Sequence, residues 1–155
     1  MFSKIDKTLY PPKDKAIMVW DGECGFCKYW TIRWAKITKD RVEYIPYQDA
    51  HSQFPDIDIQ HFKQASRLID KDGRIFSGPQ SAYKTLSHGS VWGFLNKFYE
   101  SYAWFRLFSD RLYNLIAHNR PAFFRISKFL FGSNPEEPRP FWIIYLVIIM
   151  YFMYV

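Results

Sequence analysis

Cysteine is scarce in this 155-residue chain, and the two copies, Cys24 and Cys27, lie three positions apart. One close pair cannot build the network of disulfides that holds small secreted domains together. A structural zinc site usually takes four ligands, such as a second cysteine pair or two paired histidines. No second pair exists, and the four histidines are scattered along the chain (His51, His61, His88 and His118). The pair is therefore interpreted as redox-active, with metal binding or an inert pair as the alternatives.

The first fifteen residues, 1–15, lack the apolar core of a secretory signal and form a polar lead-in. We therefore expect a cytoplasmic domain, in which a disulfide is normally transient. The formal net charge of +6 permits contact with anionic lipid or nucleic acid and establishes neither. No nucleic-acid recognition motif accompanies the basic residues, so nucleic acid is not expected as a partner.

Charge is absent from the last fifteen residues, 141–155, which follow a proline-rich linker at 133–140. As a helix, this apolar tail would be roughly 23 Å long, short of the ~30 Å hydrocarbon core of a bilayer. Membrane contact through the tail is the favoured interpretation, although a full span would be marginal. A buried terminal helix and an interfacial segment are the alternatives.

The order of predicted elements is that of a thioredoxin-like α/β domain over residues 16–89. Alternation, apolar runs and turn residues give a strand, a helix that begins at the cysteine pair, a second strand, two helical turns, a hairpin and a helix. Their predicted ranges are 16–21, 24–38, 41–48, 49–54, 58–64, 66–77 and 80–87. Asp58 is the predicted N-cap of the helical turn at 58–64, and Asp72-Gly73 is the predicted hairpin turn.

An aromatic-rich helical extension follows this sheet domain and carries much of the 21% aromatic content. Helices are predicted over 91–118 and 121–132, so that the domain with its extension covers 16–132. Arg111, Arg120, Arg125 and Lys128 occur in the second half without an acidic residue between them. This pattern fits either a basic face in solvent or an interfacial helix on anionic lipid.

The cysteines lie at the predicted start of a helix directly after a strand. A helix N-terminus carries partial positive charge and free N–H groups, which stabilise a thiolate. Cys24, nearer that end, is predicted to be the nucleophile, and Cys27 to resolve the mixed disulfide. Asp21 either accepts the proton of Cys27 during exchange or only forms the strand-to-helix turn.

The run Asp21-Gly22-Glu23-Cys24-Gly25-Phe26-Cys27 resembles the D-G-x-C-x-x-C signature of the DCC family of predicted thiol–disulfide oxidoreductases. The stretch from Tyr113 to Arg120 is similar to the family's closing Y-x-x-I-A-x-N-R motif, and Asp72-Gly73 with Gly78 and Ala82 loosely resembles an intermediate one. The resemblance covers about 16–132. It implies a thioredoxin-like fold and oxidoreductase activity, and it leaves out the tail.

Thioredoxins place a cis-proline before the third strand, facing the cysteines, whereas this chain has Gln64-Ala65-Ser66 there. A free backbone N–H at this position is expected to be available to a partner. Asn119 and Arg120 are expected to hold the extension to the domain and not to be catalytic.

The predicted function is thus thiol–disulfide exchange with a protein or small-molecule substrate. The cysteines are themselves the redox centre, so no dissociable cofactor is expected, and a thioredoxin or glutathione system would recycle them. The alternative is a membrane-associated redox sensor or assembly factor, in which the pair switches a partner contact.

Overall fold

Four short strands form the centre of the fold in a computed structural model that describes residues 2–89, 91–137, 139 and 141–154. The strands are β1 (Ala16–Trp20), β2 (Val42–Pro46), β3 (Arg67–Ile69) and β4 (Ile75–Ser77). They lie in the order β2-β1-β3-β4. β1 pairs in parallel with β2, with Met18 opposite Tyr44, and antiparallel with β3, with Met18 opposite Leu68. A parallel β-α-β unit followed by an antiparallel hairpin and a helix is consistent with a thioredoxin-like fold.

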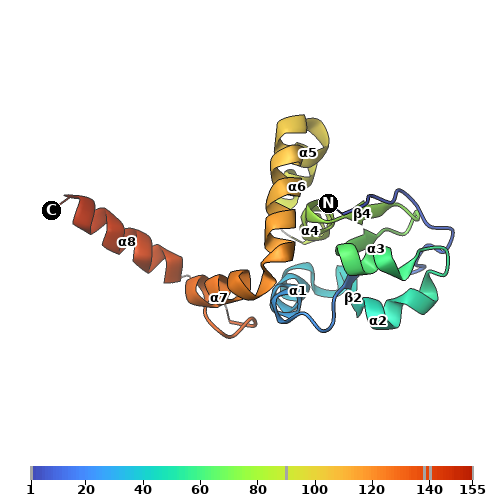
Figure 1. Cartoon of the computed structure of the whole chain (residues 1–155), viewed down its shortest axis with the longest axis horizontal. Coiled ribbons are helices and arrows are strands. Elements are labelled where there is room, and N and C mark those ends of the chain that lie inside the picture. The colour runs from blue at the N-terminus through green and yellow to red at the C-terminus, as the bar shows by residue number, and fades with distance from the viewer. Residues whose placement is uncertain (1, 90, 138, 140, 155) are drawn as a thin grey trace.

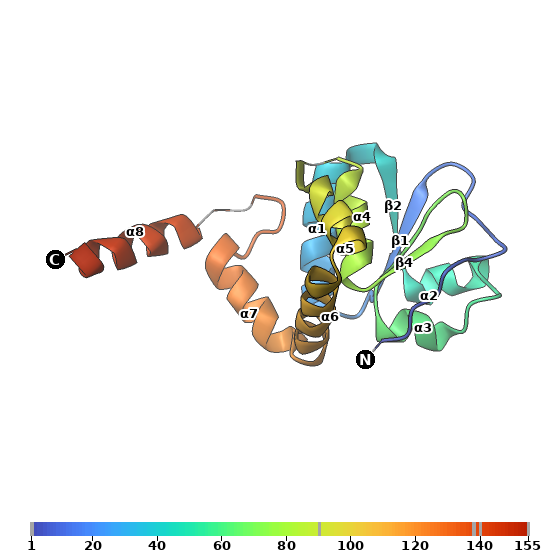
Figure 2. The ribbon, with the colours of Figure 1, turned by 90° about the horizontal axis from the view of Figure 1, so that it is seen from above.

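Eight α-helices are found within the described residues. They are α1 (Gly25–Thr38), α2 (Tyr47–Ala50), α3 (Ile59–Gln64), α4 (Pro79–Ser87), α5 (Phe94–Ser101), α6 (Ala103–His118), α7 (Arg120–Phe131) and α8 (Phe141–Tyr154). Figure 2 shows α1 and α4 on one side of the sheet and α2 and α3 on the other. The extension, α5 to α7, lies outside α1 and α4, and α8 projects away from the rest of the molecule (Figure 1).

The alternating side chains of β1 divide the core into two clusters, one on each face of the sheet. Ile17 and Val19 pack with side chains from the α2–α3 region, including Phe54 and Phe62. Met18, on the opposite face, packs in the cluster that Trp34 of α1 contacts. Because successive side chains of a strand point to opposite sides, both faces of the sheet carry apolar residues on which helices can pack. The strand therefore enters the cysteine turn with its end fixed from both sides.

The hairpin and the helical turn are confirmed at the residues that the turn chemistry indicated. Gly73 has a φ of 81°, and its N–H donates to the Asp70 carbonyl at 2.9 Å. The Asp58 carboxylate accepts from the Gln60 N–H, as an N-cap does. The second strand is shorter than predicted, because it ends at Pro46, which cannot donate to a sheet ladder, and Tyr47 begins α2.

The helical stretch predicted over 91–118 is helical in the structure, but it is divided into separate helices. A 3-10 turn at Val91–Gly93 precedes α5, and Tyr102 then separates α5 from α6 with an extended backbone, at φ −115° and ψ 113°. No glycine or proline marks this break in the sequence. The Tyr99 hydroxyl donates across the turn to the Asp110 carboxylate at 2.6 Å, so tertiary contacts favour the reversal. An amphipathic pattern alone could not reveal it.

The lead-in is packed onto the sheet domain. Phe2 is buried, and the Thr8 N–H donates to the Gly73 carbonyl at 2.9 Å. The fully buried Arg67 donates to the carbonyls of Ser3 and His61 and so joins the lead-in to the α3 region. These contacts hold the first residues against the start of β3 and against the turn between β3 and β4.

The helix α8 has no charged side chain and is exposed along most of its length. Its Tyr145 ring stacks on Phe129 of α7, with centroids 4.6 Å apart. Within the described part of the chain, no helix combines the length and apolar character needed to cross a membrane.

Candidate active site

The cysteine pair forms the first turn of α1. Cys24 is the N-cap, and its sulfur accepts a hydrogen bond from the Cys27 N–H at 3.2 Å. Both cysteines are half-buried free thiols. A Cβ atom added to Gly22 would lie 2.9 Å from the Pro46 Cβ, so the chain passes too close to β2 for a larger residue. The turn thus places two sulfurs, three positions apart in the sequence, at one end of the helix, as the sequence predicted.

The surroundings shift the pKa values of the two thiols in opposite directions. The pKa of Cys24 is lowered to about 6 by a hydrogen bond from the Cys27 thiol and by the Cys27 N–H and Arg120, against the effect of burial. The pKa of Cys27 is raised by its hydrogen bond to Cys24, by burial and by the charge on Cys24. The arrangement therefore favours a thiolate at Cys24 and a protonated thiol at Cys27.

Asp21 and Arg120 form an ion pair beside the cysteines. The Arg120 Nη1 lies 2.8 Å from Asp21 Oδ2, and each of the two side chains is 25% exposed. The other carboxylate oxygen of Asp21 accepts from the Glu23 N–H at 3.2 Å. Asp21 thus has the contacts of a turn former, and its role as a proton acceptor stays a prediction. Arg120, expected only to hold the extension in place, also acts on the charge of Cys24.

The position before β3 differs from its sequence-based expectation. The Ser66 N–H donates to the Tyr113 hydroxyl oxygen at 3.0 Å, so it is not free for a partner, contrary to the prediction. The Ser66 hydroxyl lies 3.2 Å from the same oxygen and 2.9 Å from the Ser81 hydroxyl. Tyr113 comes from α6, and the sequence does not indicate that α6 reaches this segment. The extension therefore supplies the hydrogen-bond partner for the backbone N–H that was expected to be available to a substrate or partner protein.

Replacing Tyr113 by phenylalanine is expected to lower the free energy of unfolding by about 1–3 kcal/mol, because the Ser66 N–H loses its acceptor. Chemical denaturation of the full chain measures the change. Tyr102→Phe is the control, since Tyr102 is exposed and its change should stay within about 0.5 kcal/mol. Equal effects of the two substitutions would contradict a structural role for the Tyr113 hydroxyl.

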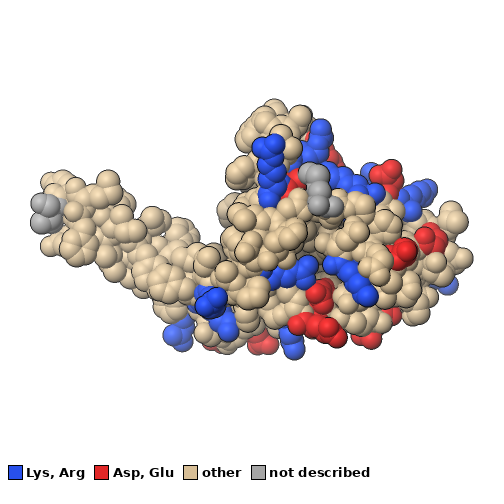
Figure 3. Space-filling view, in the orientation of Figure 1, with Lys and Arg blue, Asp and Glu red and all other residues tan. Residues whose placement is uncertain are grey.

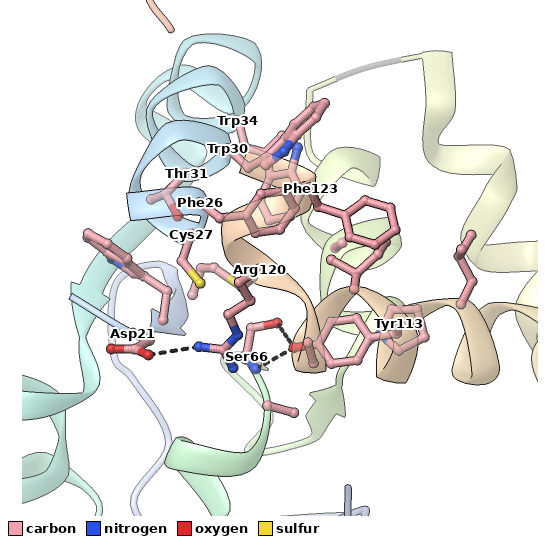
Figure 4. Close-up of a pocket in the computed structure, with 18 of the residues that line it drawn as sticks. Asp21, Phe26, Cys27, Trp30, Thr31, Trp34, Ser66, Tyr113, Arg120 and Phe123 are labelled. Carbon is pink, nitrogen blue, oxygen red and sulfur yellow. Dashed lines mark hydrogen bonds and ion pairs between the residues drawn. The ribbon is translucent and has the colours of Figure 1, made fainter. Parts of the chain in front are cut away.

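A cavity of about 330 Å³ opens beside Cys27, between the sheet domain and the extension. Figure 4 shows Cys27, Asp21 and Arg120 together, with Phe26, Trp30 and Trp34 of α1 facing Phe123 of α7. Trp30 also donates to the Ser127 hydroxyl at 3.2 Å, which joins α1 to α7. The cavity is thus built by elements from both ends of the chain.

Two residues of this site, Tyr113 and Arg120, received no chemical role from the sequence. The resemblance to the family did mark these two residues, because they are the first and last positions of the Y-x-x-I-A-x-N-R stretch. Their role depends on α6 and α7 returning to the cysteine turn, which no local pattern reveals. Among the described residues, no group of three or more His, Cys, Asp or Glu side chains could hold a metal ion.

Among the comparisons with known proteins, the comparison with family models agrees with the geometry of the pair. Searches of curated proteins and of solved structures each gave no significant match. The family model for the DCC1-like thiol-disulfide oxidoreductases matches residues 18–126, which include the cysteine turn, Tyr113 and Arg120. This match covers more than half of the chain, and the chain belongs to the DCC1-like thiol-disulfide oxidoreductase family.

Proposed function

We propose that this protein is a thiol–disulfide oxidoreductase in which Cys24 attacks and Cys27 resolves. The opposite pKa shifts of the two thiols are the main support for the proposal. The attacking sulfur must be a thiolate, whereas the resolving thiol stays protonated until the mixed disulfide has formed. With a pKa of about 6, Cys24 is mostly thiolate at neutral pH. The family assignment supports a redox role of the pair.

The exchange has two steps. The Cys24 thiolate attacks one sulfur of a substrate disulfide, which forms a mixed disulfide and releases the other sulfur as a thiolate. Cys27 then loses its proton and attacks the Cys24 sulfur, which releases the second substrate thiol and leaves a Cys24–Cys27 disulfide. Two electrons pass from the dithiol to the substrate. A thioredoxin or glutathione system of a reducing compartment would restore the dithiol.

The redox equilibrium of the full chain tests this function. The protein is equilibrated with a series of reduced and oxidised glutathione mixtures, and its thiols are trapped by alkylation and counted by mass. We expect Cys24 and Cys27 to titrate together as one two-electron couple. Independent titration of the two thiols, or no titration, would contradict the proposal.

Asp21 is proposed to accept the proton that Cys27 releases. Asp21→Asn is then expected to slow the decay of the mixed disulfide by about a hundredfold, measured by rapid mixing. The substitution keeps an oxygen that can accept from the Glu23 N–H, so the turn should survive. If Asp21 acts only through its charge, which raises the pKa of Cys27, the decay would instead become faster.

The exposed α8 favours a second candidate, a redox sensor or assembly factor that lies at a membrane surface. Figure 3 shows this helix as a projection without Lys, Arg, Asp or Glu, next to a base that carries Lys and Arg. A helix that is apolar on all sides is stable only where something other than water covers it.

Vesicle flotation tests this candidate. The full chain is expected to float with phosphatidylglycerol vesicles, and Ile144→Glu with Ile148→Glu in α8 is expected to reduce the bound fraction at least about tenfold. Redox dependence of the binding would favour the sensor role over turnover. No flotation of the unmodified chain would contradict membrane contact.

A further inference from the structure

Most of the side chains that line the cavity beside Cys27 are apolar. Phe26, Trp30 and Trp34 form the α1 wall, and Leu112, Ile116 and Phe123 form the wall made by α6 and α7. The proposed exchange steps involve the two sulfurs, Asp21 and Arg120. None of these steps involves the apolar side chains of the cavity. An apolar recess next to reacting atoms commonly binds the body of a small molecule.

The charges at the edge of the cavity do not favour a charged ligand. Asp21 and Arg120 both line it, but they are paired with each other at 2.8 Å. The other polar groups on the lining residues are uncharged: the hydroxyls of residues such as Thr31, Ser66 and Ser109, the Cys27 thiol and the indole N–H groups of the tryptophans. An uncharged group therefore suits the space better than a carboxylate or an ammonium group.

The size of the cavity favours a small molecule over a folded protein. About 330 Å³ lies at the lower end of the range of small-molecule pockets, ~300–1,000 Å³. The cavity is also bounded on two sides, by α1 and by the α6–α7 wall (Figure 4). An aromatic or branched aliphatic group fits between these walls, next to Cys27.

We propose that the cavity binds the uncharged apolar body of a small disulfide substrate and so sets the specificity of the enzyme. This inference rests on the proposed exchange function. For a substrate R–S–S–R′ with R in the cavity, Cys24 attacks the sulfur that carries R and releases R′S⁻. Cys27, which lines the cavity, then displaces RS⁻ from the mixed disulfide, and RS⁻ takes up a proton. The enzyme is left as a disulfide, which an external thiol reduces.

Ala117→Phe in the full chain tests the proposal, because Ala117 lines the cavity and the larger ring would occupy it. Second-order rate constants are measured for dipyridyl disulfide, which is aromatic and uncharged, and for hydroxyethyl disulfide, which is small and polar. Differences in leaving group cancel when each substrate is compared between variants. We expect the ratio of the aromatic to the polar rate constant to fall at least about tenfold.

Ala122→Phe is the matched control, since Ala122 is exposed on α7 and outside the cavity. The ratio should not change in this variant. Phe123→Ala is the second test, for the case that Ala117→Phe does not fold. It removes part of the α7 wall and should lower the ratio by about threefold or more. Thermal melting confirms that each variant is folded.

The outcomes separate the two proposals. If the unmodified chain exchanges with both disulfides and the ratio is the same in all folded variants, the cavity proposal is overturned and the exchange function stands. Equal losses toward both disulfides in Ala117→Phe also overturn it. If the unmodified chain exchanges with neither disulfide, the exchange function fails, and the cavity proposal fails with it.

Discussion

Cys24→Ser is expected to reduce disulfide exchange roughly a thousandfold or more, to near the uncatalysed rate. The reason is that Cys24 is the thiol with the lowered pKa, whereas the pKa of Cys27 is raised by its hydrogen bond to Cys24, by burial and by the charge on Cys24. The substitution removes the two causes that come from Cys24, but burial still disfavours a thiolate at Cys27. A serine hydroxyl is a far weaker nucleophile at neutral pH than a thiolate. The remaining Cys27 cannot substitute for Cys24.

Cys27→Ser is expected to behave differently. It keeps the nucleophile and the backbone N–H that donates to Cys24, so the first attack still takes place. The mixed disulfide then accumulates because no second thiol can displace the substrate. With oxidised glutathione, mass spectrometry should find one glutathione on Cys24 of this variant and none on Cys24→Ser. A glutathione adduct on Cys27 of the latter would reverse the assigned roles.

Arg120→Ala is expected to raise the pKa of Cys24 and to slow its reaction at low pH. The guanidinium lowers that pKa by its charge and by a hydrogen bond, in addition to the larger contribution of the Cys27 thiol. Without Arg120, less Cys24 is ionised at pH 6, so the rate of alkylation should fall there by roughly three- to tenfold. Above both pKa values Cys24 is thiolate in either protein, so the variant should react at least as fast as the unmodified protein there. The higher nucleophilicity of a more basic thiolate offsets part of the loss.

The rate of Cys24 alkylation by iodoacetamide as a function of pH measures this effect. Arg125→Ala is the matched control, because Arg125 is exposed on the same helix and does not act on the cysteine. Arg120→Lys should recover much of the low-pH rate, since it keeps the charge. If the pH profile of Arg120→Ala coincides with that of the unmodified protein, the prediction is contradicted. Arg120 would then pair with Asp21 without affecting the ionisation of Cys24.

The sheet domain could be predicted from the sequence because its signals are local. The apolar stretch at Ala16–Trp20, the Asp72-Gly73 turn and the Asp58 cap each depend on neighbouring residues, and each was found at its place. The break at Tyr102 could not be predicted, since the hydrogen bond between Tyr99 and Asp110 that accompanies it joins two helices.

The candidate site was predictable in part, for the same reason. Cys24, Cys27 and Asp21 are close in sequence, so their proximity followed from one turn. Arg120 is 99 positions from Asp21, and Tyr113 is 47 positions from Ser66. Their contacts depend on how α6 packs on α4 and how α7 packs on α1, which the apolar periodicity of those helices does not specify. The resemblance to the family motif marked both residues without indicating what they contact.

The measurement that tests the central claim most directly is the pH titration of the Cys24 thiolate in the reduced, unmodified chain, followed by its ultraviolet absorbance and by its alkylation rate. The account predicts one thiolate that forms with a midpoint near pH 6, assigned to Cys24 by the mass of its alkylated peptide, and no ionisation of Cys27 in the same range. A Cys24 midpoint near the usual 9.0, or ionisation of Cys27 before Cys24, would contradict it.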